Sequence, residues 1–163
     1  MILVGIGSNL PSSASDAPED NCRKALELIG KAGIKVAGVS RFYKTAPVPA
    51  SDQPWYVNAV ASVETDLPPE AVLEKLLEIE AAVGRERAER NAARIVDLDL
   101  LAYDNRVLDG DRLTLPHPRL PERAFVLLPL KDIAPDWVHP VTKQSLAGLV
   151  GALDPAQKIE ILD

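Results

Sequence analysis

The sequence predicts an α+β fold in which helices pack on the faces of a mainly antiparallel sheet. Three observations support this prediction. Short apolar or alternating runs, typical of strands, recur along the chain. Two helical patterns stand between them, in the order strand, helix, strand, strand, helix, strand. The composition, 163 residues of which 47% are hydrophobic and 26% are charged, is typical of one globular domain.

Each core element has a local cause. Pro18 and Pro68 suit the first turn of a helix, and Gly30 and Gly84 end one. The first strand is continuously apolar, as expected for a buried strand, whereas the two middle strands alternate. The proline-rich segment 44–54 predicts a loop. In chain order we expect a strand over 1–6, a helix over 18–30, strands over 34–42 and 56–65, a helix over 68–84 and a strand over 95–103.

Shorter elements follow residue 103. Asp104 and Asn105 predict a hairpin turn, and residues 113–116 predict a short edge strand. Further along we expect a helix over 121–130 that ends near Pro129, a helix over 145–153 and a strand over 158–162. Because no repeat or linker interrupts the chain, we expect one domain over 1–163. Its element order is that of the ferredoxin-like βαββαβ core, and helices on both faces of the sheet would make three layers, αβα.

Net charge and cysteine content argue against several classes of protein. A net charge of −6 argues against general binding to nucleic acid or to membrane surfaces. No apolar run approaches the roughly 18 residues of a membrane span, and no basic segment precedes the first apolar run as in a secretory signal. Cys22 is the only cysteine, which favours a reducing compartment. We expect a cytoplasmic protein without nucleic-acid or membrane partners, and we expect a monomer.

Two carboxylates in an apolar strand are the sharpest functional signal. Asp97 and Asp99 interrupt a run of Ile, Val, Leu and Ala. Alternate strand residues point to the same face, roughly 6.6 Å apart along the strand, so both carboxylates would share a face with Ile95 and Leu101. If buried there, they would repel each other and lose hydration, unless a cation that prefers oxygen ligands, such as Mg²⁺, bound both. The alternative is that each Asp pairs with a neighbouring Arg.

Arginine is concentrated in one part of the chain. Eight of the ten arginines, and none of the lysines, lie within 85–123. Planar forked donors suit phosphate groups, although an exposed helix with i,i+4 pairs to Glu would also explain them. Four of these arginines directly precede the acidic strand: Arg85, Arg87, Arg90 and Arg94. Cations beside carboxylates are what a magnesium–nucleotide complex requires, although the chain has no P-loop motif. Three later arginines could complete the cluster or could be ordinary surface residues: Arg112, Arg119 and Arg123.

Several other side chains could contact a ligand. Two prolines flank His117 and hold its backbone stiffly, which suits a fixed hydrogen-bond donor, although an isolated His is more often structural. Tyr56 and Phe125 could clamp a flat ring or could belong to the core. Asn58 is predicted to lie on the same strand face as Tyr56, where its amide could read the donor and acceptor edge of a heterocycle.

Six short motifs occur in order and at suitable spacing. They are Ile6-Gly-Ser-Asn-Leu10, Phe42-Tyr-Lys-Thr45, Asp52-Gln-Pro-Trp-Tyr-Val-Asn58, Ile79-Glu80 with Gly84-Arg-Glu-Arg87, Arg94-Ile-Val-Asp-Leu-Asp99, and Leu113-Thr-Leu-Pro-His117 with Arg123-Ala-Phe125. Through them the chain resembles, nearly from end to end, the 6-hydroxymethyl-7,8-dihydropterin pyrophosphokinase family of the folate pathway.

The resemblance implies a reaction and a role for each motif. The hydroxymethyl oxygen of the pterin would attack the β-phosphorus of ATP, and AMP would leave. Two Mg²⁺ ions bound by Asp97 and Asp99 would bridge the triphosphate, and Arg85 and Arg94 would act on the phosphates as catalytic residues. The pterin would contact Thr45, Ala46, Val48, Tyr56, Asn58 and Phe125. ATP would contact Arg87, Leu100, Arg112, Thr114, His117 and Arg123. Supporting positions would be Gly7, Ser8, Asn9 and Glu80.

Two other classes of function predict different residues. A non-catalytic relative that binds ATP or the pterin would be expected to lose its charged catalytic positions, yet Asp97, Asp99 and His117 are all present, together with Arg85 and Arg94. A purely structural or interaction domain of the same fold would not need two acids in an apolar strand. The sequence therefore favours the enzyme.

Overall fold

A computed structural model describes residues 1–9, 17–47, 54–84 and 95–162. Its strands are β1 (Ile2–Ser8), β2 (Lys35–Val39), β3 (Tyr43–Thr45), β4 (Tyr56–Glu64), β5 (Asp97–Tyr103), β6 (Leu108–Asp109), β7 (Thr114–Leu115) and β8 (Ile159–Ile161). Its helices are α1 (Pro18–Lys31), α2 (Pro69–Gly84), α3 (Ala124–Ile133) and α4 (Leu146–Gly151), and a 3-10 turn over Leu120–Glu122 precedes α3. The predictions that concern residues 10–16, 48–53 and 85–94 lie outside the described residues.

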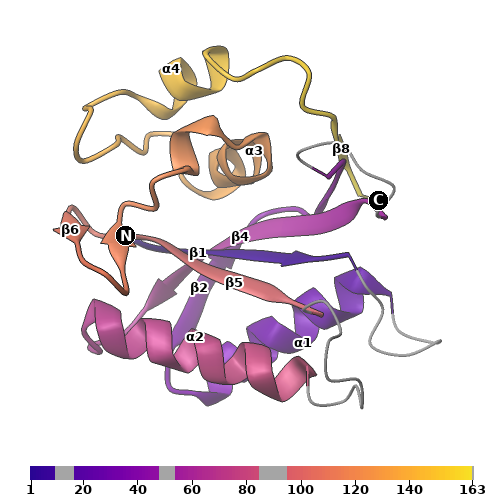
Figure 1. Ribbon diagram of the computed structural model, residues 1–163, viewed down its shortest axis with the longest axis vertical. Helices are drawn as coiled ribbons and strands as arrows, with labels where there is room; N and C mark the ends of the chain where they lie inside the picture. The colour runs from indigo at the N-terminus through magenta and orange to yellow at the C-terminus, as the bar shows by residue number, and fades with distance from the viewer. Residues whose placement is uncertain (10–16, 48–53, 85–94, 163) are drawn as a thin grey trace.

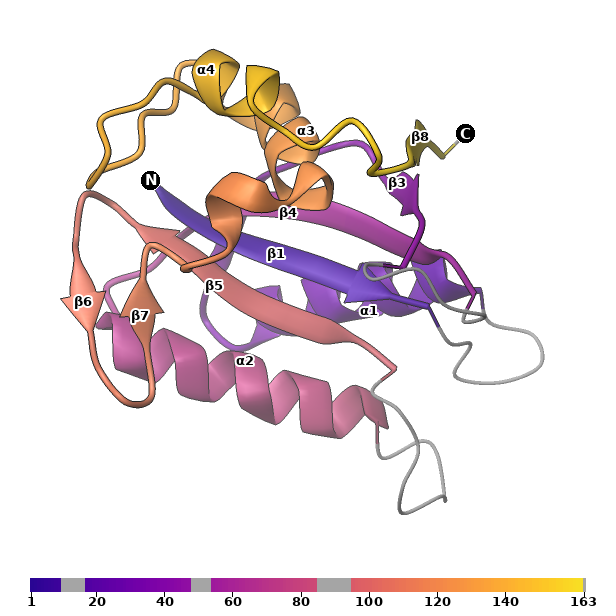
Figure 2. The same cartoon turned by 45° about the horizontal axis from the view of Figure 1, so that its top comes forward.

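The main sheet has the order β5-β1-β4-β3-β8, and β2 pairs with the other half of β4 beside β3. All its described pairings are antiparallel. Helices α1 and α2 cover one face of the sheet, and α3 and α4 cover the other (Figures 1 and 2). This arrangement confirms the predicted α+β fold with a ferredoxin-like core and three layers.

Strand alternation divides the interior into two cores. On β4, Val57, Ala59 and Ala61 face α1 and α2, where they join one apolar cluster. Val60 points the other way, toward the cluster beneath α3 and α4. Because side chains alternate across a strand, odd-numbered and even-numbered residues of β4 contact different helical layers. The functional site described below uses the second face, at the end of the sheet where the α3 cluster stops.

The structure corrects three local predictions. Residues 44 and 45 were expected in a loop, but they belong to β3, which lies between β4 and β8. Pro129 was expected to end its helix, but α3 continues through it to Ile133. Ile95 was expected to share a face with Asp97, but it precedes β5 and packs in the cluster beneath α1 and α2.

A polar cluster fixes α3 to the neighbouring strand β3. The Tyr43 hydroxyl donates to Asp132 on α3 over 2.8 Å, and the Arg41 guanidinium donates to the same carboxylate over 2.9 Å and 3.2 Å. Burial alone would raise the pKa of Asp132, but the hydrogen bonds from Arg41 and Tyr43 hold it below its usual value. The carboxylate therefore stays ionised near neutral pH and links the second helical layer to the sheet.

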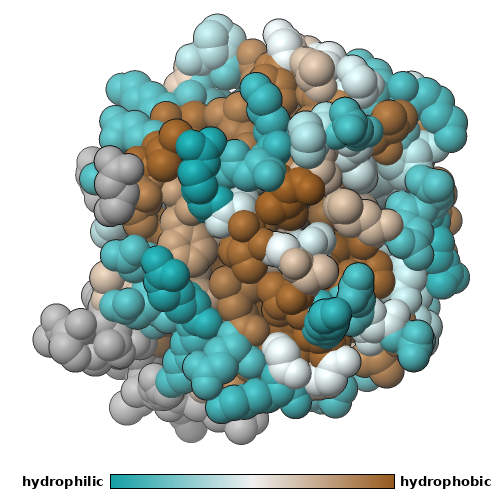
Figure 3. All heavy atoms as spheres, turned by 180° about the vertical axis from the view of Figure 1, so that it is seen from behind, coloured by the Kyte–Doolittle hydropathy of each residue, from teal (hydrophilic) through white to brown (hydrophobic). Residues whose placement is uncertain are grey.

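Cys22, the exposed surface and the helix lengths show three further properties of the fold. Cys22 is fully buried in α1, and burial raises its pKa to about 12, so the thiol stays protonated. Seen from behind, hydrophobic residues gather at mid-height, at the level of the sheet, between more hydrophilic rims (Figure 3). Among the described residues, every helix is too short or too polar to cross a lipid bilayer.

His139 should make the stability of the α3–α4 layer depend on pH. Its ring is buried, and burial lowers its pKa below the usual value. The neutral Nδ1 accepts the backbone N–H groups of Val141 and Thr142, both over 3.2 Å, which a protonated ring could not do. As pH falls below about 6.5 the unfolded chain takes up the proton first, so the free energy of unfolding decreases.

The measurement is urea unfolding at about pH 7 and about pH 5.5, a range that brackets the ordinary histidine pKa. The variant His139→Asn keeps an acceptor for the same two amides but does not titrate. We expect it to lose less stability than the native chain on acidification. An equal loss in both proteins would contradict a role for His139.

Candidate active site

A cavity of about 250 Å³ opens on the α3 face of the sheet, at one end of the strands. Its floor comes from the main sheet and its roof from the start of α3. It is lined by Gly5, Ile6, Gly7, Thr45, Ala46, Tyr56, Asn58, Ala59, Asp97, Asp99, Arg123, Phe125 and Val126. It brings together nine of the residues predicted from the sequence, from five separate elements or their ends.

Glycines on β1 leave the cavity floor open. Gly5 lies opposite Asp99 of the adjacent strand β5, and Gly7 lies opposite Asp97. A Cβ atom added at Gly7 would lie 2.6 Å from Oδ1 of Asn58, closer than any stable contact. Glycine at position 7 therefore lets the Asn58 amide keep its place, because a Cβ there would displace it.

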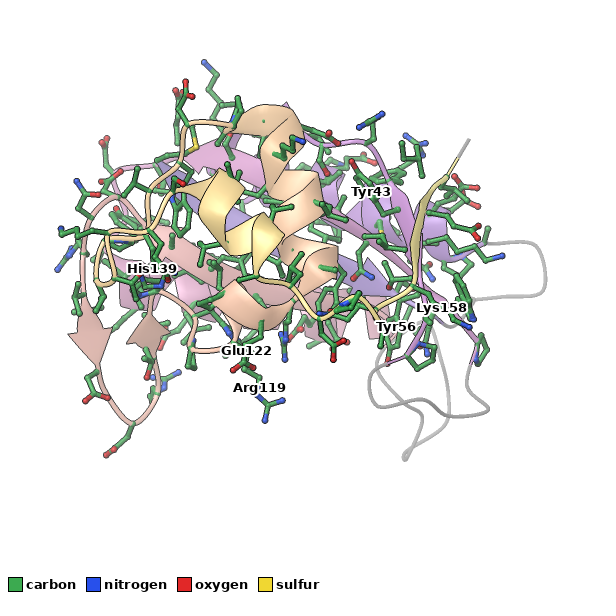
Figure 4. All side chains as sticks on the ribbon, turned by 90° about the horizontal axis from the view of Figure 1, so that it is seen from above. Tyr43, Tyr56, Arg119, Glu122, His139 and Lys158 are labelled. Carbon is green, nitrogen blue, oxygen red and sulfur yellow. The ribbon has the colours of Figure 1, made fainter. Side chains whose placement is uncertain are left out.

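The Asn58 end of the cavity is polar and fixed. The amide nitrogen of Asn58 donates to the hydroxyl oxygen of Thr45 over 2.6 Å, and both side chains are more than nine-tenths buried. Tyr56 on β4 and Phe125 on α3 bring aromatic rings from different layers of the fold. Figure 4 shows Tyr56 near the carboxyl-terminal strand, at the same side of the molecule as Lys158. A rigid amide beside two rings suits a flat, hydrogen-bonding heterocycle.

The two carboxylates lie at the opposite edge of the cavity. Asp97 and Asp99 both line it, and both are half-buried, so they share one face of β5 as expected. Between them, the backbone N–H of Leu98 donates to Oε2 of Glu80 on α2 over 2.8 Å. Glu80 thus holds the acidic end of β5 from the far side of the sheet.

Positive charge approaches Asp99 from α3. The Arg123 guanidinium lies 4.0 Å from Oδ2 of Asp99 and stacks over the Phe125 ring at 5.1 Å. Burial lowers the pKa of Arg123, and the Asp99 carboxylate opposes that effect. Burial likewise lowers the pKa of His117, with Asp99 again opposing it, so this ring is neutral at pH 7. Its Nδ1 accepts the backbone N–H of Arg119 over 3.1 Å, which leaves Nε2 as the donor.

The remaining described residues of the prediction lie outside the cavity lining. Ser8 and Asn9 are buried at the end of β1, where Asn21 donates to Ser8 over 3.4 Å and Asn9 donates to the Pro54 carbonyl over 3.4 Å. The side chain of Leu100 packs in the core beneath α1 and α2, on the opposite face from Asp99. This placement directs it away from the cavity.

Two further predicted ATP contacts lie in and beside the β6–β7 hairpin. Arg112 is exposed and forms an ion pair with Glu74 of α2, with 3.4 Å between Nη1 and Oε1. Thr114 pairs with Asp109 in the hairpin and is half-buried. The structure does not bring either side chain to the cavity. Four other predicted positions lie outside the described residues: Arg85, Arg87, Arg94 and Val48.

The donors present suit magnesium bound together with a phosphate ligand. Within 1–9, 17–47, 54–84 and 95–162, no group of three or more His, Cys, Asp or Glu side chains could hold a metal by itself. Asp97 and Asp99 offer carboxylate oxygens at the edge of an open cavity. Mg²⁺ typically takes one or two carboxylates and completes its shell with water and substrate phosphate oxygens. The pair therefore fits Mg²⁺ with a nucleotide. Of the alternative pairings with arginine, the structure gives a long contact of 4.0 Å between Asp99 and Arg123.

Sequence reasoning missed four lining residues: Gly5, Ile6, Ala59 and Val126. Gly5 could have been predicted from the sequence. It lies two residues before Gly7 in an otherwise apolar strand, so both glycines share one face of that strand. The other three are buried apolar residues of the two cores, and the sequence offers nothing to distinguish a core residue that also borders a cavity from one that does not.

Comparisons with known proteins agree with this geometry. Residues 3–135 match the family model of 7,8-dihydro-6-hydroxymethylpterin-pyrophosphokinase (HPPK). A 2-amino-4-hydroxy-6-hydroxymethyldihydropteridine pyrophosphokinase of Methylorubrum extorquens is 40% identical over 154 residues, covering 94% of this chain and 93% of that one. The protein of the same name from Haemophilus influenzae is 41% identical over 138 residues, covering 84% and 83%.

Similarity to solved structures concerns the fold. The chain superposes on wild-type HPPK-DHPS of Plasmodium falciparum with a TM-score of 0.70 at 14% identity, covering 92% of this chain and 40% of that one. At this identity the match supports the three-layer fold alone. The family match and the two bacterial relatives go further, because each covers most of the chain. The chain belongs to the 7,8-dihydro-6-hydroxymethylpterin-pyrophosphokinase family.

Proposed function

We propose that this chain transfers the pyrophosphoryl group of ATP to the hydroxymethyl oxygen of 6-hydroxymethyl-7,8-dihydropterin, a step of folate biosynthesis. The observation that carries the proposal is the layout of one cavity, with a buried amide and two aromatic rings at one edge and two carboxylates at the other. A site with these two edges can hold a heterocycle and a metal-bound triphosphate next to each other. The family membership supports the same reaction.

The pterin would lie at the Asn58 edge. Tyr56 and Phe125 would contact the faces of its ring, and Asn58 and Thr45 would hydrogen-bond its edge, with Ala46 beside them. Because Asn58 is itself held by Thr45, its orientation does not have to be fixed when the ligand binds. Val48, outside the described residues, would complete this contact as the family resemblance implies.

The triphosphate of ATP would lie at the carboxylate edge, with two Mg²⁺ ions held by Asp97 and Asp99. Bound there, Mg²⁺ would neutralise the phosphate oxygens and orient the β-phosphorus. Arg123 faces the same edge and supplies forked donors for phosphate oxygens. The remaining ATP contacts proposed from the sequence are Arg87, Leu100, Arg112, Thr114 and His117, and Arg85 and Arg94 would act on the transferring group.

The cavity can align the two substrates for a direct transfer. The pterin hydroxymethyl oxygen attacks the β-phosphorus, the bond from that phosphorus to the oxygen bridging the α- and β-phosphates breaks, and AMP leaves with that oxygen. The hydroxyl proton is lost to solvent or to a carboxylate. Holding the oxygen and the phosphorus in contact accounts for much of the rate, since phosphoryl transfer depends mainly on positioning and on charge stabilisation.

The proposal extends to the setting of the enzyme. Its partners are small molecules, ATP and the pterin, and we propose a cytoplasmic monomer that does not bind nucleic acid. The net charge of −6 supports the last of these points. The protonated, buried thiol of Cys22 is compatible with a reducing compartment.

AMP release tests the proposed function. Purified protein is incubated with Mg²⁺ and ATP, with and without 6-hydroxymethyl-7,8-dihydropterin, and AMP is quantified by chromatography. We expect stoichiometric formation of AMP and pterin diphosphate when the pterin is present, and little AMP without it. Binding of both ligands with no AMP in either case would favour the non-catalytic alternative.

The close contact above Gly7 gives a further prediction. The substitution Gly7→Ala adds a Cβ that would lie 2.6 Å from Oδ1 of Asn58, so the amide has to move and its hydrogen bond to Thr45 is strained. We expect the Kd for the pterin to rise by about tenfold or more, because a misplaced polar group in the site is lost to binding. Isothermal titration with the pterin measures it.

Gly30→Ala is the matched control, because no atom lies within 4 Å of a Cβ added at Gly30, which is in α1. We expect it to bind the pterin like the native protein. Native-like binding by Gly7→Ala would show that Asn58 does not contact the ring.

A further inference from the structure

The carboxyl-terminal segment reaches both walls of the cavity, although it lies beyond residue 135, where the family match ends. After α4 the chain passes the start of α3, near Glu122, and continues to the sheet edge near Tyr56 (Figure 4). There β8 pairs with β3, with Ile159 opposite Thr45. The segment thus touches the roof of the cavity first and its floor directly afterwards.

Gln157 holds the backbone at the start of α3. Its side-chain oxygen accepts the N–H of Ala124 over 2.9 Å, and its side-chain nitrogen donates to the carbonyl of Glu122 over 2.9 Å. These two backbone groups flank Arg123, which precedes the helix in an extended conformation with φ −104° and ψ 113° and has no capping hydrogen bond from its own side chain. The Gln157 amide therefore provides the cap that the local sequence lacks.

Lys158, next to Gln157, holds the opposite wall of the cavity at the end of β3. The carbonyl of Lys158 accepts the backbone N–H of Ala46 over 3.1 Å, at the end of β3. Ala46 and Thr45 line the cavity on this side, and Arg123 and Phe125 line it from α3. Two consecutive residues thus fix the separation between the roof and the floor of the cavity.

A groove behind Arg123 and Phe125 explains why the hydrogen bonds of Gln157 matter. A groove of about 620 Å³ is lined by these two residues on one side and by Leu153, Asp154 and Gln157 on the other. Arg123 and Phe125 therefore have space on the side away from the substrates. The two hydrogen bonds of Gln157 span the groove and oppose an outward movement of the roof.

We propose that Gln157 is a positioning residue for the pyrophosphoryl transfer. It fixes the start of α3, so that Arg123 faces Asp99 and Phe125 faces the pterin site. Gln157 itself lies outside the cavity lining and acts through these two residues. The proposal rests on the proposed function for its effect on catalysis, but its effect on the backbone of α3 can be measured without turnover.

The test uses Gln157→Met in the full-length chain, because Met has similar length and volume but neither polar group. We expect the Ala124 amide to exchange with deuterium on the order of tenfold faster, as one hydrogen bond at a helix start is lost. We also expect kcat/KM to fall by about tenfold, with a change of Tm of only a few degrees, because misplacement of groups at the site costs rate more than it costs stability. Gln144→Met, at an exposed loop residue before α4, is the control and should change neither quantity.

A double-mutant cycle separates positioning from a general loss of stability. If Gln157 acts through Arg123, then Gln157→Met should reduce kcat/KM far less in an Arg123→Ala background than in the native chain. Gln157→Glu keeps the acceptor for Ala124 and loses the donor to Glu122. Its Ala124 amide should exchange at a rate between those of the native chain and Gln157→Met. This variant replaces Gln157→Met in the test if Gln157→Met does not fold.

Three results overturn the proposal. They are unchanged exchange at Ala124, native kcat/KM in Gln157→Met, and full additivity with Arg123→Ala. Failure of the native chain to release AMP would instead reject the proposed function, while the exchange rate at Ala124 would still decide whether Gln157 holds the start of α3.

Discussion

Replacing Asp97 or Asp99 by asparagine is expected to lower kcat by a factor on the order of 10³, since each variant removes a charged metal ligand from the triphosphate. Asparagine keeps the size and one oxygen of the side chain but loses the charge that Mg²⁺ requires. The fold should survive, because both side chains are half-buried at the edge of a cavity and not in either core. Turnover and metal binding should therefore be lost together.

A second readout keeps this prediction independent of turnover. Mg²⁺ with a non-hydrolysable ATP analogue should raise the Tm of the native chain, as any ligand of the folded state does. We expect this increase to be lost in both variants and retained in Asp109→Asn, which changes an exposed carboxylate on β6. Metal-dependent stabilisation of the Asp97 and Asp99 variants equal to that of the native chain would show that the ion binds elsewhere.

Arg123→Lys is expected to lower kcat/KM by about a hundredfold although the positive charge is kept. A guanidinium presents forked donors to phosphate oxygens, whereas an ammonium is a point charge and cannot reproduce that geometry. The native side chain is also placed by stacking on Phe125 at 5.1 Å and by Asp99, which lies 4.0 Å away. A lysine could use neither contact in the same way, so we expect KM for ATP to rise and kcat to fall.

The chain offers a closely matched control for this substitution. Arg106 also stacks on an aromatic ring, that of Tyr103 at 5.8 Å, but it lies exposed after the turn that follows β5. Steady-state kinetics of Arg106→Lys should equal those of the native enzyme. If both lysine variants keep native kinetics, the side chain at position 123 contributes only its charge. The proposed contact of a forked guanidinium with phosphate oxygens would then be wrong.

The alternation of apolar residues was enough to predict most of the sheet. It placed Val57 and Ala59 on the core face of β4, which left Tyr56 and Asn58 for the other face, where the cavity lies. The same alternation on β5 placed Asp97 and Asp99 on one face. These predictions succeeded because each strand buries one face against helices, so the pattern of the sequence and the layer of the fold must agree.

The errors have physical causes that a local pattern does not contain. β3 is three residues long, and it exists because β4 and β8 hydrogen-bond it from both sides, a fact about distant residues. α3 continues past Pro129 because Leu130 beyond it is fully buried in the core, and that burial offsets the hydrogen bond that proline removes.

The site was predictable where it depends on charge or aromaticity in an unusual place, and unpredictable where it depends on contacts between distant segments. Asp97 was visible because a carboxylate in an apolar strand needs an explanation. Gln157 was not, since a glutamine near the end of a chain is ordinary until its amide is seen to bridge Glu122 and Ala124. The Arg85–Arg94 segment, on which several predicted roles depend, lies outside the described residues.

In the proposed function, one cavity holds both the pterin and the metal-bound triphosphate. A crystal structure of the complex with the pterin, a non-hydrolysable ATP analogue and Mn²⁺ in place of Mg²⁺ tests this most directly, because the anomalous signal of Mn²⁺ locates the metal independently of the other atoms. We predict anomalous peaks at the carboxylates of Asp97 and Asp99, with the pterin ring between Tyr56 and Phe125 and its edge on Asn58. Metal peaks away from both carboxylates, or a pterin bound outside this cavity, would contradict the account.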